Sequence, residues 1–511
     1  MRRNALAGRV TRQRIGLPLG PAVFAVLLLL RPFDIAPSAN AALASTLWIA
    51  IWWVTEAIPI PATSLLPVVL FPVTGVVGVA GATAPYADPV VFLLLGGFLL
   101  ALAIERWGLH RRIALTIVSL VGVRADRLLL GFMVATAFLS MWISNSATAM
   151  LMVPIGTAVI VSVGTVGGRD GDTTDDAPDA PDGTLVAGTG ADPQERPATD
   201  FGLALMLGIA YSASIGGVAT LIGSPPNAVF AGVAASRLDV QITFLDWLVF
   251  AAPLSVVFLL LAWLVLVVRF APELPQEGSI ERLIRAQRDA LGPMSRGERR
   301  VLAVFVAVAA GWVLRPFVLQ PVFPAITDTV VAVVGGILLF VVPVDYRNRE
   351  FLLDWRDTAR LPWGVLVLLG AGFSLANGFQ ESGLDALIAD GLASIAGVPL
   401  VVLLLAVATV VVFLTEVTSN TATATVFMPI MISLGLTLGV PPLTLMAAVS
   451  LAASMAFMLP VATPPNAVVF GSGYVTIPQM STTGFWLNLL GILAIVALTY
   501  LWLPIALGIA G

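Results

Sequence analysis

Long apolar segments with almost no charged residues constrain this chain more than any other feature of its sequence. The clearest are Leu17–Leu30, Val90–Ile104, Leu248–Val268, Val301–Val313, Thr329–Val342 and Trp486–Leu507. Only 11% of the 511 residues are charged, whereas soluble domains contain roughly 25%. A segment of about 18 such residues crosses a bilayer as a helix, which bonds its own backbone groups. The sequence therefore predicts an all-α, polytopic integral membrane protein with about eleven transmembrane helices.

The residue types that the chain lacks exclude several kinds of chemistry. It has no cysteine, and its 26 basic residues are all arginine. Disulfides, thiolate metal sites, Schiff-base chemistry and a phosphate-binding lysine are therefore excluded. The single histidine, His110, lies among arginines, and we interpret it as an interfacial side chain. Because no nucleophile–base pair or metal-binding cluster is visible, the sequence does not favour an enzyme and predicts no organic cofactor.

The distribution of arginine predicts how the chain is oriented. Cytoplasmic loops are enriched in arginine, and no arginine follows Arg360. The arginine-rich segments are Arg2–Arg14, Arg106–Arg127, Arg282–Arg300 and Arg347–Arg360. We therefore expect a protein of the plasma (inner) membrane with a cytoplasmic N-terminal tail at residues 1–14. The stretch around Glu381–Val398 is expected outside.

Two polar segments interrupt the apolar pattern. Residues 165–200 are rich in Gly, Pro, Asp and Thr and predict a disordered acidic insertion. Residues 271–300 predict a polar linker with an amphipathic helix at Ile280–Leu291. We therefore expect two halves, residues 15–270 and 301–511, joined by a cytoplasmic linker.

The two halves contain a duplicated sequence. Ser144–Ile155 reads SNSATAMLMVPI and Ser419–Ile430 reads SNTATATVFMPI, with seven of twelve positions identical at an offset of 275. Pro225–Val229 matches Pro464–Val468 at an offset of 239, and the difference of 36 is close to the length of the acidic insertion. The repeat predicts re-entrant hairpins at about 126–165 and 398–437, and broken helices at 201–235 and 442–475.

Equivalent positions of the repeat differ in charge. The residues 275 positions after five arginines are uncharged or acidic, and these arginines are Arg106, Arg111, Arg112, Arg124 and Arg127. We therefore expect the two copies on opposite faces of the membrane. That is the inverted-repeat architecture of many secondary transporters, whose binding site lies between the repeats near the middle of the bilayer.

Each Ser-Asn-Ser or Ser-Asn-Thr motif lies between two apolar arms. It predicts either the tip of a re-entrant hairpin or the break between two full spans, and charge does not separate these. A hydroxyl lies four residues upstream, at Ser140 or Thr415, on the same helix face as the first serine of the motif. Hydroxyl, amide and carbonyl oxygens suit a hard cation such as Na⁺. One motif alone could simply bond neighbouring helices, whereas a matched pair favours a site.

The Pro-Pro-Asn motifs predict a broken helix in each half. Two successive prolines force the chain out of the preceding helix. Such a break is tolerated at membrane depth only inside protein or along a cavity. The residues before it, Gly223-Ser224 and Ala462-Thr463, can offer carbonyl oxygens and a hydroxyl. For either copy alone, a structural kink is the alternative.

The charge of these motifs favours a cation-coupled process. No arginine falls within them, so an anionic substrate would be neutralised by helix N-termini, polar donors and bound cations. Two acids, Glu56 and Glu416, lie at or near membrane depth. For each acid, a structural role and a proton- or cation-binding role are both possible interpretations.

Together these motifs resemble those of the divalent anion–sodium symporters, a family of dicarboxylate, citrate and sulfate carriers. The resemblance rests on the two pairs of motifs and on Trp52–Pro59, and it covers about residues 15–508. It implies a homodimer in the lipid bilayer. Each protomer would have two re-entrant hairpins, a scaffold domain and a transport domain that moves as an elevator.

The resemblance also implies site residues by motif position. One Na⁺ site would use Ser140, Ser144, Asn145 and Gly223, and the other Thr415, Ser419, Asn420 and Ala462. Substrate carboxylates would meet Asn145, Ser146, Ser224, Asn420, Thr421, Thr463 and Pro464. Ser146 and Ser224 stand where the family commonly has threonine, and both keep the hydroxyl. The implied function is sodium-coupled symport of small divalent anions, above all C4-dicarboxylates such as succinate.

Other functions remain alternatives. A dicarboxylate exchanger, or a citrate or sulfate carrier, fits the same motifs. Uptake of labelled succinate with and without Na⁺ would separate these. Saturable transport would argue against a channel. No nucleic-acid partner is expected.

Overall fold

The computed structural model is almost entirely helical, as the apolar segments predict. It describes residues 2–32, 35–122, 124–167, 200–272, 277–392 and 397–508. Most of the insertion predicted at 165–200, residues 168–199, lies outside the described residues, whereas residues 165–167 belong to a helix and Asp200 begins the next one. Within the described residues, nine helices are long and apolar enough to cross a membrane, and four shorter apolar helices accompany them. This confirms the prediction of an all-α integral membrane protein.

The first half contains the following elements. They are α1 (Arg2–Leu30), α2 (Pro37–Thr55), α3 (Ile60–Thr63), α4 (Leu66–Thr74), α5 (Val79–Thr83), η1 (Ala84–Ala87), α6 (Pro89–Arg106), α7 (Leu109–Val121), α8 (Ala125–Ser140), α9 (Asn145–Gly167), α10 (Asp200–Val218), α11 (Pro225–Leu238) and α12 (Phe244–Phe270).

The linker and the second half follow. They contain α13 (Glu277–Asp289), α14 (Arg296–Leu314), η3 (Arg315–Leu319), α15 (Asp328–Val341), β1 (Pro343–Asp345), β2 (Glu350–Phe351), η4 (Trp355–Arg360), α16 (Trp363–Ser382), α17 (Leu384–Leu392), α18 (Leu400–Thr415), α19 (Asn420–Leu438), α20 (Pro442–Ala453), α21 (Pro464–Gly471), α22 (Ile477–Ala497), η6 (Leu498–Trp502) and α23 (Leu503–Ala506). Among the described residues, the antiparallel pair β1–β2 is the one sheet, which the sequence did not predict.

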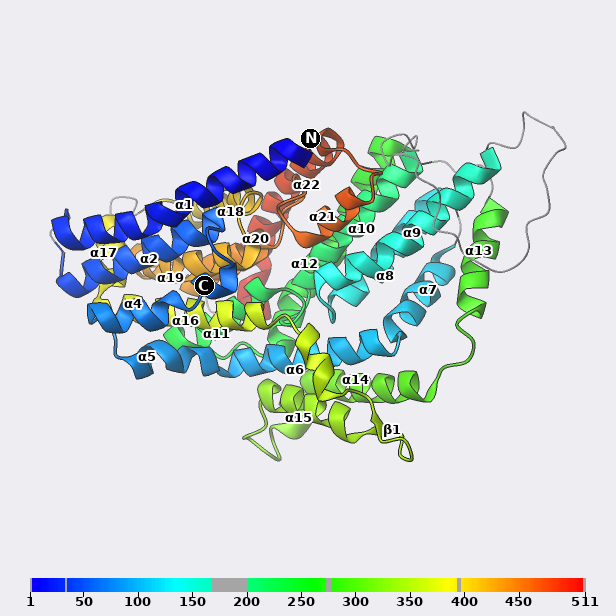
Figure 1. Ribbon diagram of the computed structural model, residues 1–511, viewed down its shortest axis with the longest axis horizontal. Helices are drawn as coiled ribbons and strands as arrows, with labels where there is room; N and C mark the ends of the chain where they lie inside the picture. Colours follow the sequence, from blue (N-terminus) through cyan, green and yellow to red (C-terminus); the bar gives the residue numbers. More distant parts are fainter. Residues whose placement is uncertain are drawn as a thin grey trace.

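The centre of the molecule is formed by α10 and α20. Every residue of α10 from Phe201 to Val218 is buried, and so is α20 from Leu443 to Ala453. Small residues allow this close packing, because a Cβ on Gly216 would lie 2.2 Å from the Ala137 carbonyl oxygen of α8. In Figure 1, α1 lies along one edge of the molecule and α14 and α15 along the opposite edge.

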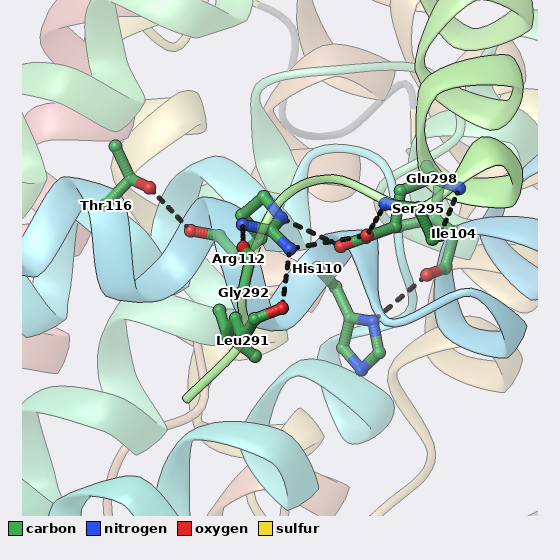
Figure 2. Close-up of polar contacts among 8 residues, drawn as sticks. All are labelled: Ile104, His110, Arg112, Thr116, Leu291, Gly292, Ser295 and Glu298. Atoms are coloured by element: carbon green, nitrogen blue, oxygen red, sulfur yellow. Dashed lines mark hydrogen bonds and ion pairs between the residues drawn. The ribbon is translucent and has the colours of Figure 1, made fainter. Parts of the chain in front are cut away.

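A polar cluster helps to fix the linker to the helices. Arg112 of α7 donates to the Glu298 carboxylate at 2.8 Å and to the carbonyl oxygens of Gly292 and Leu291 at 3.0 and 3.2 Å (Figure 2). Glu298 in turn accepts from Ser295 N–H, so the same carboxylate caps α14. These bonds hold the end of the linker against α7.

Candidate functional site

The first Ser-Asn motif breaks the chain between α8 and α9. Ser144 is the residue before α9, and its hydroxyl accepts from Ala147 N–H at 3.3 Å while its carbonyl accepts from Thr148 N–H at 3.0 Å. The hydroxyl satisfies an N–H group that a helix start otherwise leaves free, and the carbonyl accepts the first bond of the helix. Ser144 therefore has an observed capping role.

The second motif repeats these contacts 275 residues later. Ser419 accepts from Ala422 N–H at 3.4 Å through its hydroxyl and from Thr423 N–H at 2.9 Å through its carbonyl. The duplicated sequence therefore forms a duplicated local structure at the starts of α9 and α19.

An oxygen cluster lies beside the first motif. The Asn145 side-chain oxygen lies 2.6 Å from the Ser140 hydroxyl oxygen. The same amide atom is 3.2 Å from the carbonyl oxygens of Ala213 and Gly223. The Ser140 hydroxyl is also 2.6 Å from the Ala213 carbonyl, and it has one hydrogen to share between two acceptors. Two arrangements satisfy the cluster: an amide turned so that its nitrogen donates, or a cation among the oxygens.

A related cluster lies beside the second motif. The Thr415 hydroxyl is 2.7 Å from the Asn420 side-chain oxygen and 3.1 Å from the Ala453 carbonyl oxygen. Again one hydroxyl hydrogen faces two acceptors. The sequence analysis did not predict Ala213 or Ala453, because every residue has a backbone carbonyl and residue type does not show which one is a ligand.

The Pro-Pro-Asn motifs end the two breaks. Pro225 and Pro464 open α11 and α21, where proline's missing N–H costs no helical bond. Before them the backbone leaves the helix at residues 219–224 and 454–463. The two breaks lie at equivalent places in the repeat.

The asparagine of each Pro-Pro-Asn motif holds its break in shape. Asn227 donates to the carbonyls of Gly217 and Thr220 at 3.1 and 2.8 Å. Asn466 makes the equivalent bonds to Ala456 and Leu459 at 3.1 and 3.0 Å. The duplicated Pro-Pro-Asn motif pointed to these two asparagines, but the sequence analysis assigned them no role.

The two breaks meet in the middle of the protein. The hydroxyl oxygens of Ser224 and Ser454 lie 3.0 Å apart, and Ser450 donates to the Asn227 side-chain oxygen at 3.2 Å. Ser224 directly follows Gly223 of the first cluster, and Ser454 directly follows Ala453 of the second. The two oxygen clusters therefore belong to one polar centre.

The other predicted residues lie around this centre. Thr421 and Thr463 are buried, and Ser146 is half-buried in the first turn of α9. Ala462 is buried directly before Thr463, whereas Pro464 is exposed. Of the predicted site residues, two sets lie within polar contact of one another. They are Ser140 with Asn145 and Gly223, and Thr415 with Asn420.

The two acids at membrane depth have different surroundings. Glu416 is buried and accepts four hydrogen bonds, from Phe457, Met458 and Leu459 N–H and from the Asn488 amide. Glu56 ends α2 in a left-handed conformation with φ 49°. Glu416 therefore belongs to the second break.

Two cavities lie near the arginine-rich segments. One of about 490 Å³ is lined by Arg296, Arg300 and Arg347, away from both Ser-Asn motifs. Another of about 280 Å³ reaches Ala147 and Thr148 of α9. Its lining also includes Glu105, His110 and Arg360.

The histidine that lines the second cavity is half-buried. Its Nδ1 lies 3.1 Å from the Ile104 carbonyl oxygen (Figure 2). Burial lowers the pKa of His110 below its usual value near 6.5. The lining of this cavity beside α9 thus combines the Glu105–Arg360 ion pair with the His110 ring.

Comparison with known proteins identifies the relatives of this chain. Residues 17–509 match the family described as the sodium:sulfate symporter transmembrane region. A protein of Staphylococcus saprophyticus named Sodium-dependent dicarboxylate transporter SdcS is 41% identical over 502 residues, covering 97% of this chain and 92% of that protein. The protein of the same name from Staphylococcus aureus (strain MRSA252) is 42% identical over 504 residues, covering 98% and 93%. The resemblance inferred from the motifs is confirmed, and the chain belongs to the sodium:sulfate symporter family.

Proposed function

We propose that this protein is a secondary active transporter that couples Na⁺ to the uptake of small dicarboxylates such as succinate. The observation that carries the proposal is the matched pair of clusters, in which a hydroxyl and an asparagine amide converge with backbone carbonyls, at Ser140 and Asn145 in one half and at Thr415 and Asn420 in the other. A hard cation prefers oxygen ligands of this kind. The names of the two relatives, both sodium-dependent dicarboxylate transporters, support the same ion and substrate class.

Each cluster would hold one Na⁺ in this proposal. The first site uses Ser140, Asn145 and Gly223, with Ser144 capping α9, and the Ala213 carbonyl joins it. The second uses Thr415, Asn420 and Ala462, with Ser419 capping α19, and the Ala453 carbonyl joins it. Oxygen ligands from a hairpin and from a broken helix would thus meet at each ion.

The dicarboxylate would lie between the two ions. The helices α9 and α19 begin at Asn145 and Asn420 of the two clusters, and the positive end of a helix dipole favours an anion. The helices α11 and α21 add the same dipole but few N–H donors, because each begins with two prolines. Asn145, Ser146, Ser224, Asn420, Thr421, Thr463 and Pro464 are the proposed contacts. Since no arginine lies in the Ser-Asn or Pro-Pro-Asn motifs, binding of the anion would depend on bound Na⁺, which links the two fluxes.

The larger architecture is part of the same proposal. Matching contacts in the two halves support an inverted repeat, with α8–α9 and α18–α19 as re-entrant hairpins. The helices that contain the motifs pack on one another, α9 against α21 and α11 against α19, which supports their movement as one transport body. We further propose a homodimer in the inner membrane with a cytoplasmic N-terminus.

Uptake by the purified protein in liposomes tests the function. Labelled succinate should accumulate with an inward Na⁺ gradient and not with choline. Asn145→Ala and Asn420→Ala should each lower uptake at least tenfold, since each removes the amide of one cluster. Asn377→Ala is the matched control, because that amide bonds to Gly81 on α5, outside both motifs. Equal uptake in choline, or full activity of both cluster variants, would refute the proposal.

Competition in the same assay defines the substrate class. The family description names sulfate, so unlabelled sulfate and citrate are added beside succinate and malate. We expect the C4-dicarboxylates to compete most strongly. Efflux that requires an external dicarboxylate but no Na⁺ would instead indicate exchange.

A further inference from the structure

Glu416 is placed where a carboxylate can organise the second break. It is 3% exposed and directly follows Thr415 of the second oxygen cluster. One carboxylate oxygen accepts from Phe457 N–H at 2.8 Å and Met458 N–H at 2.9 Å, and the other accepts from Leu459 N–H at 3.0 Å. Three consecutive backbone groups of the unwound segment are thus bonded to one side chain.

A fourth donor fixes the carboxylate from the other side. The Asn488 amide of α22 donates to it at 2.7 Å. All four of these partners are donors, which suits an ionised carboxylate, a group that can only accept. Bonds to a charged acceptor are also stronger than neutral ones. Glu416 therefore joins the second hairpin, the unwound segment and α22 at one point.

The segment that Glu416 holds leads to proposed ligands. Residues 457–459 lie between Ala453, whose carbonyl faces Thr415, and Ala462-Thr463 at the start of α21. Without the carboxylate, the buried N–H group of Phe457 and the half-buried ones of Met458 and Leu459 would lack these partners, and buried unpaired donors are costly. The path of the backbone to Ala462 and Thr463 depends on this anchor.

In the first half, the backbone of the break is held by a neutral hydroxyl instead of a carboxylate. Met141 is the position equivalent to Glu416, and Thr220 is the position equivalent to Leu459, by the two offsets of the repeat. The Thr220 hydroxyl donates to the Met141 carbonyl at 2.5 Å and accepts from Gly223 N–H at 3.0 Å. In both halves the broken helix donates to the residue after Ser140 or Thr415, but only the second half uses a charged side chain.

We infer that Glu416, with Asn488, is a positioning residue that shapes the second cation site, and that the two sites differ in this dependence. The inference rests on the proposed function, because it assigns Na⁺ to the cluster at Thr415 and Asn420. Glu416 does not itself contact the ion, since its oxygens are already taken by four donors. Loss of its charge therefore weakens Na⁺ binding at the second site and leaves the first site intact.

The test is the Na⁺ dependence of succinate uptake by full-length variants in liposomes. Glu416→Gln places an NH₂ against backbone N–H groups, so the Na⁺ concentration for half-maximal uptake should rise about tenfold. The rate at saturating Na⁺ should change much less. Glu416→Asp keeps the charge and should recover part of the loss. Asn488→Leu removes one donor only and should give a smaller shift in the same direction.

Met141→Leu is the matched control at the equivalent position. Its tie to Thr220 uses the backbone carbonyl, so the Na⁺ dependence should stay that of the wild type. If Glu416→Gln is not monodisperse in detergent, Glu416→Asp and Asn488→Leu decide the question. Wild-type Na⁺ dependence in the folded Glu416 and Asn488 variants would overturn the inference, as would a lower maximal rate without a Na⁺ shift. A wild-type protein that ignores Na⁺ would instead refute the proposed function.

Discussion

At the scale of single residues, the first cluster depends on one close approach between helices. Asn145, Ser140 and the Gly223 carbonyl meet because α10 comes very close to α8 and to the start of α9. Gly217 makes that approach, since a Cβ there would lie 2.4 Å from the Asn145 side-chain oxygen. The equivalent position of the second half is Ala456. A methyl group is therefore tolerated in one half and excluded in the other.

This difference predicts unequal effects of matched substitutions. Gly217→Ala should displace the Asn145 amide and lower Na⁺-dependent uptake at least tenfold, with an overpacking cost of about 1–3 kcal/mol. Ala456→Gly removes a methyl group and should cost only about 0.5–1 kcal/mol of stability, with uptake largely retained. Uptake and thermal unfolding of both variants are measured together. Normal uptake by Gly217→Ala would contradict the close approach.

At the scale of elements, the sequence predicts features that follow from side-chain patterns and repeated motifs. It does not predict contacts made by backbone carbonyl groups. Apolar length predicted the helices, and prolines predicted the breaks ending at Pro225 and Pro464. Serine–asparagine motifs predicted Asn145 and Asn420 as polar contacts. The Ala213 and Ala453 carbonyls could not be predicted, because any residue carries a carbonyl and only the packing of two helices aims it.

The roles of Glu416 and of the β1–β2 pair were unpredictable for related reasons. The sequence left Glu416 open between a structural and an ion-binding role, since its donors come from a segment about forty residues away. The β1–β2 pair is too short for an alternating pattern to identify. In both cases the decisive partner is set by tertiary structure.

The attachment of the linker is an element-scale feature that can be tested separately. Arg112→Ala leaves the Glu298 carboxylate without its guanidinium partner, and Glu298 is buried. We expect a loss of about 1–3 kcal/mol of stability, seen as a lower melting temperature. Arg285→Ala is the control, because its pair with Glu281 is exposed and i,i+4 pairs contribute about 0.3–0.5 kcal/mol. Equal melting temperatures for the two variants would contradict the anchoring role.

At the scale of the whole molecule, the two halves supply one centre from opposite ends of the chain. Residues near 140, 220, 415 and 455 lie far apart in sequence, yet Ser224 and Ser454 touch. A ligand bound there joins both repeats and α22. Binding should therefore stabilise the entire fold rather than one domain.

Sodium should accordingly raise the melting temperature of the full chain. A ligand that binds only the folded state, present at a concentration of about a hundred times its dissociation constant, raises the free energy of unfolding by about 2.7 kcal/mol. We expect succinate to add further stability in Na⁺ and none in choline at equal ionic strength. The double variant Asn145→Ala/Asn420→Ala should lose the Na⁺ effect. An equal response to choline would show a general salt effect instead.

The most direct measurement is an experimental density map of the protein with Na⁺ and succinate bound. The account predicts one cation against Ser140, Asn145 and Gly223, a second against Thr415, Asn420 and Ala462, and one elongated ligand between them beside Ser224 and Ser454. Cations or succinate bound only in the arginine-lined cavity at Arg296, Arg300 and Arg347, with both oxygen clusters empty, would contradict it.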